Sequence, residues 1–242
     1  MRRRKAMSIL DSLRPTPDLR VLVTAGASGV GAAIACAFHE AGARVHVCDI
    51  DRSALDRLNA DAPGITGSMA DAAVAADVDL VFDDVEGTLG GLDVLVNSAG
   101  IPGPTGPIDT IDRQAWERTV AVNLHSQYYF ARRAVPLLKR SRTGPSLIAM
   151  GSVASGAGHA FRVPYVSTKW AIVGLVKSLA IELGPAGIRV NAILQRALAA
   201  TSRRSAAADG CAALALFLCS PAGRNLTGQA ISIDGDGELL PE

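Results

Sequence analysis

Short runs rich in β-branched residues alternate with Ala- and Leu-rich helical stretches along almost the whole chain. The first run, RVLVT at 20–24, is followed by a glycine-rich turn and a helix that should end near Ala41. A helix between two parallel strands makes a right-handed crossover, so this alternation predicts one sheet covered on both faces. We therefore expect an α/β fold with a doubly wound parallel sheet of about seven strands and helices on both faces. The expected strands cover 20–24, 43–49, 65–69, 92–97, 146–151, 188–193 and 230–234, and the later helices about 53–59, 74–89, 113–140, 165–183 and 206–219.

No linker or internal repeat interrupts this alternation, so residues 20–242 are expected to form a single domain. Residues 1–19 begin with a basic cluster, Arg2 to Lys5, and we expect them to form a flexible basic N-terminal arm. A formal net charge of +1 gives no global field that would attract nucleic acid or an anionic membrane surface. No stretch is long enough to span a bilayer and no secretory signal is found, so we expect a cytoplasmic protein with neither a nucleic-acid nor a membrane partner.

The four cysteines, Cys36, Cys48, Cys211 and Cys219, show neither CxxC nor metal-type spacing. We interpret them as small buried hydrophobic residues in a reducing compartment, and we expect no metal site. His46 and His159 also lack a ligand or triad partner at useful spacing, although His159 could touch a substrate.

The first turn of the predicted sheet, VLVTAGASGVGAAIA, places Gly26, Gly29 and Gly31 between a strand and a helix. Glycines at this spacing allow a tight turn and a close approach of the backbone to a pyrophosphate, which the free N–H groups of the helix start would bind. Asp49 ends the second strand, where a carboxylate can accept hydrogen bonds from a ribose and repel a 2′-phosphate. Asp49 could also be a plain strand-end residue, but the preceding turn favours a cofactor contact. The pattern thus predicts a Rossmann-like dinucleotide site for NAD, with NADP disfavoured.

Several short motifs follow one another on this alternation. The glycine-rich turn reads TAGASGVG, with Ala25 as its second residue, and NSAG follows the fourth predicted strand. VNL contains Asn123, Ser152 precedes Tyr165 by thirteen residues, and Tyr165 with Lys169 forms YxxxK. In this order the motifs resemble those of the short-chain dehydrogenase/reductase family, which the chain resembles from about residue 20 to residue 235. The family has TGxxxGxG with a glycine in place of Ala25, and NNAG with an asparagine in place of Ser98.

The resemblance implies a role for each matching residue. Asn123, Ser152, Tyr165 and Lys169 would be catalytic, and Tyr165 and Lys169 would also contact the cofactor. Asp71 could equally cap the following helix. The remaining cofactor-binding residues would be Ser28, Gly29, Val30 and Gly31 at the pyrophosphate, Asp49 and Ile50 at the adenosine ribose, Asp71 and Ala72 at the adenine, and Asn97, Ala99 and Gly100 at the nicotinamide ribose.

Tyr165 and Lys169 are four residues apart and so share one face of a helix. A phenol alone is a poor base at neutral pH, but an ammonium group beside it favours the phenolate form. Tyr165 could then exchange a proton with an alcohol as hydride leaves the carbon, while Ser152 hydrogen-bonds the same oxygen. Each residue also has a plain structural interpretation: a core tyrosine, a lysine that reaches the surface, and a turn serine.

The chain departs from the family pattern after its sixth predicted strand. The usual Pro-Gly turn is replaced by Gln195 and Arg196, and the final helix follows almost at once. We expect a shortened substrate lid near 195–206. A lid excludes water and completes a site, so its loss leaves a second hypothesis open, a catalytically weak nucleotide-binding scaffold that acts as a sensor or interaction protein.

The predicted helices at 116–138 and 165–183 are apolar on more than one side. Such helices need a further surface to cover them, which predicts a homodimer or homotetramer. The first hypothesis for function is an NAD-dependent oxidoreductase that interconverts a secondary alcohol and a ketone. Its small-molecule substrate is not identified by the sequence.

Overall fold

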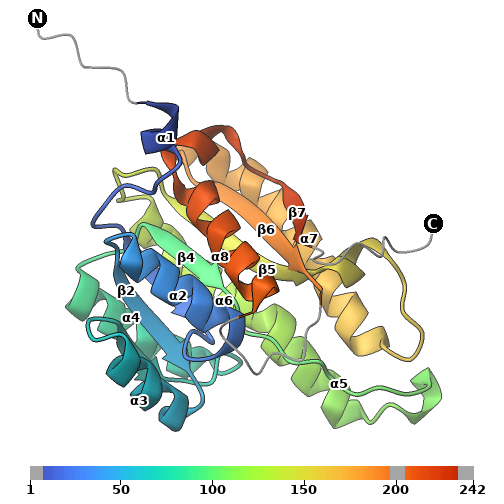
Figure 1. Ribbon diagram of the computed structural model, residues 1–242. Helices are drawn as coiled ribbons and strands as arrows, with labels where there is room; N and C mark the ends of the chain where they lie inside the picture. Colours follow the sequence, from blue (N-terminus) through green and yellow to red (C-terminus); the bar gives the residue numbers. More distant parts are fainter. Residues whose placement is uncertain (1–7, 197–204, 234–242) are drawn as a thin grey trace, which may run out of the picture.

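The computed structural model of the chain describes residues 8–196 and 205–233 (Figure 1). Seven parallel strands form one sheet in the order β3-β2-β1-β4-β5-β6-β7. The strands are β1 (Arg20–Thr24), β2 (Arg44–Asp49), β3 (Thr66–Met69), β4 (Val94–Asn97), β5 (Ser146–Ser152), β6 (Arg189–Gln195) and β7 (Ala230–Ile233). The helices are α1 (Ile9–Ser12), α2 (Gly29–Glu40), α3 (Arg52–Asp61), α4 (Ala75–Leu89), α5 (Arg113–Val120), α6 (Ser126–Leu138), α7 (Val163–Leu183) and α8 (Ala206–Cys219).

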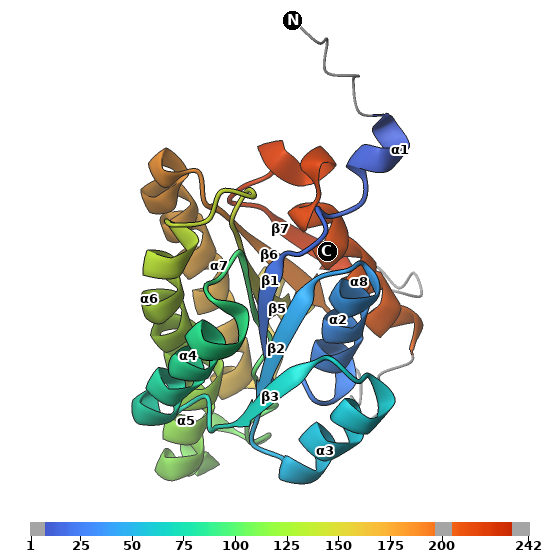
Figure 2. The same ribbon diagram turned by 90° about the vertical axis from the view of Figure 1, so that its left-hand side faces the viewer.

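The helices cover the two faces of the sheet in separate groups, as Figure 2 shows. One face packs against α2, α3 and α8 around a core that includes Phe38 and Leu58. The other packs against α4, α6 and α7 around a second core that includes Phe82 and Phe130. Strands buried on both faces read as continuous apolar runs, which explains the composition of β1 and β4. The predicted doubly wound α/β sheet is confirmed.

The chain reverses its direction of winding between β1 and β4, which are neighbours in the sheet. In open α/β sheets a ligand site lies outside the carboxyl ends of the strands at such a reversal. The Thr24 hydroxyl holds the two strand ends together by accepting hydrogen bonds from the N–H groups of Ser98 and Ala99, at 2.9 and 3.0 Å. This fixes where the loops after β1 and β4 begin.

Polar side chains set several helix starts. Asp51, Asp112 and Ser205 cap α3, α5 and α8 by accepting a hydrogen bond from the N–H three residues on. Helix α7 begins at Val163, two residues before the expected start at 165, because Pro164 fits the first turn of a helix.

The helical stretches expected at 113–140 are α5 and α6, and a wide π turn at Ala121–His125 joins them. Asn123 lies in this turn and is fully buried. Its amide accepts from the N–H of Ile101 at 2.7 Å and donates to the Ile101 carbonyl at 3.0 Å and to Thr168 Oγ1 at 3.1 Å. These tertiary hydrogen bonds compensate for the less regular backbone hydrogen bonding of a π turn. The local sequence does not predict them.

Part of the segment expected to be an arm at 1–19 has regular structure: it holds α1, and Leu19 is buried in a core. Residues 1–7 of that arm, most of the lid expected at 195–206 and the last residue of the strand expected at 230–234 lie outside the described residues. Three cysteines are buried, whereas Cys36 is half-buried, and all four are free thiols. Among residues 8–196 and 205–233, none of the helices combines the length and apolar character needed to cross a bilayer.

Candidate active site

In the glycine-rich turn after β1, the backbone at Gly31 packs closely against the backbone of Ala25 and Gly26. A side chain at Gly31 would collide with the carbonyl oxygen of Ala25, so only glycine fits there. Gly29 has a φ of +52° and begins α2 directly after Ser28, its N-cap. The first N–H groups of a helix have no intrahelical acceptor, so the Ser28–Gly31 segment presents backbone donors and the positive end of the helix dipole. This is suitable for an anion such as a pyrophosphate.

A cavity of about 120 Å³ lies between the carboxyl ends of β1, β2, β3 and β4. Asp49 is anchored at this cavity, because its two carboxylate oxygens accept from the N–H groups of Ala27 and Asp51, both at 3.1 Å. The structure brings together six of the residues expected from the sequence, and all of them line this cavity: Asp49, Ile50, Asp71, Ala72, Ala99 and Gly100.

Arg118 also lines this cavity, although no sequence motif predicted it there. Its guanidinium forms an ion pair with Asp71 at 2.9 Å. Asp71 accepts a further hydrogen bond from the N–H of Ala73, whereas the N-cap of α4 is Val74. Asp71 therefore shapes the turn before α4 without capping that helix, and Arg118 balances its charge.

Lys169 lies beneath Tyr165 on the first turns of α7. Its Nζ is 5.6 Å from the centre of the tyrosine ring and donates a hydrogen bond to the Met150 carbonyl at 3.1 Å. Only 6% of Lys169 is exposed, and this burial lowers the pKa of its ammonium to about 8. A group with that pKa still carries its positive charge at neutral pH, so the tyrosine ring has a cation beneath it.

Ser152 ends β5 and is 1% exposed. Its hydroxyl oxygen accepts a hydrogen bond from the N–H of Ala154 at 3.2 Å, which leaves its own proton available to a neighbouring oxygen. Ser152 and Tyr165 line the same cavity, of about 310 Å³, with Arg162 and His159 beside them. The two residues expected to supply the catalytic hydroxyls therefore line one cavity.

Gly100 lines the 120 Å³ cavity and also lies beside Asn123 and Lys169. A Cβ on Gly100 would be 3.4 Å from both Asn123 Oδ1 and Lys169 Nζ, so this glycine links the two parts of the site. Asn97 does not line either cavity: it is buried against α6, where its Nδ2 donates to the Gln127 carbonyl at 3.3 Å. Its Oδ1 accepts no hydrogen bond from any described residue.

The sequence matches a family model described as Enoyl-(Acyl carrier protein) reductase over residues 24–205. A protein named short chain dehydrogenase/reductase from Colletotrichum higginsianum is 36% identical over 195 residues, which cover 78% of this chain and 73% of that protein. The chain belongs to the short-chain dehydrogenase/reductase family.

Other relatives extend this result. D-threitol dehydrogenase from Mycolicibacterium smegmatis is 32% identical over 237 residues, with 88% of this chain and 90% of that protein covered. A crystal structure of 3-ketoacyl-(acyl-carrier-protein) reductase from Brucella melitensis complexed with NADH has a TM-score of 0.85. The identity is 29%, and the match covers 91% of this chain and 98% of that one.

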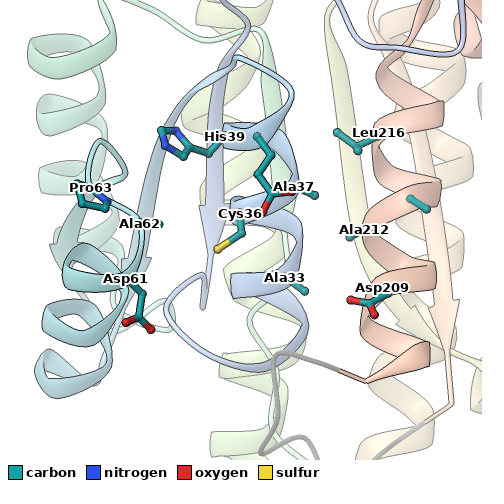
Figure 3. Close-up of a pocket in the computed structure, with 12 residues that line it drawn as sticks. Ala33, Cys36, Ala37, His39, Asp61, Ala62, Pro63, Asp209, Ala212 and Leu216 are labelled. Atoms are coloured by element: carbon teal, nitrogen blue, oxygen red, sulfur yellow. The ribbon is translucent and has the colours of Figure 1, made fainter.

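This short-chain dehydrogenase/reductase has a larger hollow away from the strand ends, of about 570 Å³ (Figure 3). It lies between α2, the end of α3 and α8, and its lining includes Cys36, His39 and Asp209. None of the residues expected to bind cofactor or substrate lines it. Within the described ranges, no cluster of His, Cys, Asp or Glu has the arrangement of a metal site.

His46 has a structural environment. Its ring nitrogens hydrogen-bond the hydroxyls of Thr66 and Ser68, both at 2.8 Å, and Ser68 in turn donates to Asp84 at 2.5 Å. Burial lowers the pKa of His46 to about 4, against a weaker opposing effect of the Asp84 charge. The ring is therefore neutral at physiological pH and joins β2 to β3.

Proposed function

We propose that the protein is an NAD(H)-dependent oxidoreductase that interconverts a secondary alcohol and a ketone, with Tyr165 as the general acid/base. The observation that carries this proposal is that Ser152 and Tyr165 face one cavity while the Lys169 ammonium lies beneath the tyrosine ring. Neither the 570 Å³ hollow nor the 120 Å³ cavity has a serine or a tyrosine in its lining.

The chain's own residues fit an extended dinucleotide. Glycine at position 31 allows the turn to pack closely on itself, so that the N–H groups at the start of α2 are presented to a pyrophosphate, and the 120 Å³ cavity offers a fixed carboxylate. Ser28 to Gly31 would hold the pyrophosphate, Asp49 and Ile50 the adenosine ribose, and Asp71 and Ala72 the adenine. Asn97, Ala99, Gly100 and Lys169 would lie toward the nicotinamide ribose. When bound, the nicotinamide supplies or accepts the hydride.

The choice of NAD over NADP depends on Asp49. Two backbone N–H groups hold its carboxylate, and each oxygen keeps a further lone pair for a ribose hydroxyl. The same negative charge would repel a 2′-phosphate. Arg118, the cation in this cavity, is already engaged with Asp71 and is therefore less available to a phosphate.

Tyr165 takes the hydroxyl proton from an alcohol in oxidation and returns a proton to the ketone oxygen in reduction. Lys169 favours the phenolate through its charge, and Ser152 donates a hydrogen bond to the substrate oxygen as negative charge develops there. Asn123 uses its amide to fix Ile101 and Thr168, so we assign it a role in holding the catalytic turn of α7 against the loop after β4. Its expected role in binding a water beside Lys169 stays a prediction.

We further propose a cytoplasmic homodimer or homotetramer with a short substrate lid. Apolar side chains of α6 and α7 are exposed in the single chain, among them Tyr128, Trp170 and Ile181 with 53%, 50% and 80% exposure. A second subunit would cover them. Strand β6 ends at Gln195 and α8 begins at Ala206, so residues 196–205 are the whole connection available for a lid.

The test replaces Tyr165 by Phe. We expect kcat/KM on the best of a panel of polyols, sugars, hydroxysteroids and 3-ketoacyl thioesters to fall by about 10²–10⁴. NAD affinity measured by calorimetry should stay within about threefold, because the hydroxyl is lost but the ring remains. Tyr128→Phe, at an exposed position of α6, is the matched control and should retain activity. Equal activity of Tyr165→Phe and wild type would overturn the mechanism, and NAD binding without turnover on any substrate would favour the sensor hypothesis.

A further inference from the structure

The charged residues that line the 310 Å³ cavity at Tyr165 and Ser152 are all positive. Two guanidinium groups, from Arg162 and Arg196, and the His159 imidazole border it. The other lining residues are Ser152, Val153, Ala154, Tyr165 and Val166, so no carboxylate from the described part of the chain lines it. This contrasts with the 120 Å³ cavity, whose lining includes the two carboxylates Asp49 and Asp71 and one arginine.

Arg162 is the cation with the most clearly defined geometry. It is the N-cap residue of α7, and its guanidinium carbon lies 5.1 Å from the centre of the Tyr165 ring. Its Nη1 donates to Thr105 Oγ1 at 3.0 Å and its Nη2 to the Pro102 carbonyl at 3.2 Å. Both acceptors are neutral, and Arg162 forms no ion pair with any residue in 8–196 or 205–233.

The electrostatic environment of this guanidinium is positive. The start of α7 contributes the positive end of a helix dipole, and Lys169 adds a charge on the same tyrosine ring. A guanidinium has five N–H donors, of which two are used here, so donors remain for a carboxylate or phosphate. A cation that is held in place by neutral groups and lacks a counter-ion provides a binding site for an anion.

We propose that the substrate is anionic: an alcohol or ketone whose carboxylate or phosphate group binds Arg162 while its reacting oxygen lies at Tyr165 and Ser152. This inference rests on the proposed function for the reacting oxygen, but the anion site itself depends only on the cavity. Arg162 contacts the ring of the catalytic tyrosine, so the anionic group and the reacting carbon are a few bonds apart in one small molecule. Arg162 is thus a specificity-determining residue, and Arg196 adds positive charge to the same wall.

The experiment uses two matched pairs of ketones that differ in charge. The first pair is 4-oxopentanoate and its methyl ester, and the second is dihydroxyacetone phosphate and dihydroxyacetone. Binding is measured by ligand-observed NMR titration, with and without saturating NAD⁺, which cannot reduce a ketone. Reduction by NADH is followed separately by absorbance. The proteins are wild type, Arg162→Gln, Arg162→Lys and Arg140→Gln, the last a control for an exposed arginine at the far end of α6.

We expect wild type to bind the anion of at least one pair ten times more tightly than its neutral partner. The pair with the larger ratio distinguishes a carboxylate from a phosphate ligand. In Arg162→Gln the ratio should fall to about one, with the neutral partner unchanged, whereas Arg162→Lys should keep part of it and Arg140→Gln all of it. A role limited to holding the loop at Pro102 and Thr105 would weaken both partners of a pair alike, so the ratio separates the two roles.

Anions that bind no tighter than their neutral partners, or identical ratios in Arg162→Gln and Arg140→Gln, would overturn the anion site. If Arg162→Gln does not fold by circular dichroism, the wild-type ratio and that of Arg162→Lys decide. Arg162-dependent anion binding without reduction of any ketone would uphold the anion site and count against the proposed oxidoreductase. Reduction of the neutral ketones alone would support the proposed oxidoreductase and count against the anion site.

Discussion

The two cavities at the carboxyl edge of the sheet differ in how their charges are balanced. On the adenosine side, Asp49 is held by two backbone N–H groups and Asp71 is paired with Arg118. On the substrate side, Lys169 is held by a carbonyl and Arg162 by a hydroxyl and a carbonyl, all of them neutral. Among the described residues, the adenosine side thus keeps the negative charge of Asp49 without a paired cation, whereas the substrate side keeps the positive charges of Lys169 and Arg162 without a paired carboxylate.

The largest expected effect comes from removing the buried charge of the substrate side with Lys169→Met. We expect turnover to fall at least a hundredfold, because the tyrosine loses the cation beneath it. We expect the free energy of unfolding at pH 7 to rise by about 2–3 kcal/mol, because an apolar side chain of similar length replaces a desolvated ammonium.

The pKa of Lys169 determines whether the free energy of unfolding rises or falls with pH. It is lowered from 10.5 to about 8 in the folded protein, so between these pH values the unfolded chain binds more protons. Wild-type stability should therefore increase as the pH rises through this window, and the advantage of Lys169→Met should shrink. Urea denaturation at pH 7 and pH 10 measures both. If Lys169→Met were less stable than wild type at pH 7, the buried Lys169 ammonium would not destabilise the folded protein.

The next effect concerns the adenosine side and uses Asp49→Asn. We expect NADH to bind about tenfold more weakly, or 1.4 kcal/mol, because an amide is a poorer acceptor for the ribose hydroxyls. NADPH should gain affinity, because the repulsion of its 2′-phosphate disappears. Fluorescence titration with both nucleotides gives the ratio, and Asp83→Asn, an exposed position on α4, is the matched control. A parallel loss for both nucleotides would assign Asp49 a purely structural role.

The smallest effect tests the turn that replaces a family glycine by alanine. Ala25 has a φ of +47°, a left-handed conformation that costs a residue with a Cβ about 1 kcal/mol. Ala25→Gly should therefore raise stability by up to about 1 kcal/mol, or about 3 °C in Tm. Ala27→Gly, at a position without positive φ, should lower the Tm instead. Thermal unfolding by calorimetry compares the two, and a lower Tm for Ala25→Gly would mean that the turn is not strained.

The sequence predicted the residues of the adenosine side more fully than those of the substrate side. Asp49, Asp71 and Gly100 line one cavity because each lies at the end of a strand or within three residues after it, so the predicted strands were enough to bring them to one edge of the sheet. Helix α8 was predicted at its observed bounds. Arg118 and Arg162 were missed because each acts through a partner distant in sequence, Asp71 or the loop at Pro102. The contact of Asn97 with α6 is not visible in any strand pattern, and its expected place at the nicotinamide ribose stays a prediction.

The π turn at Ala121–His125 has a consequence for anyone who redesigns this region. An α-helix advances about 100° per residue, so one residue too many in a turn shifts every later side chain around the axis by that amount. A helical wheel drawn straight through 113–138 would therefore assign the wrong face to Phe130 and everything beyond it. Deleting a single residue within 121–125 would convert the π turn to a regular α-helical turn, which could leave the buried face of α6 in place. It would remove the bulge that presents Asn123, and with it the anchor of the loop that follows β4.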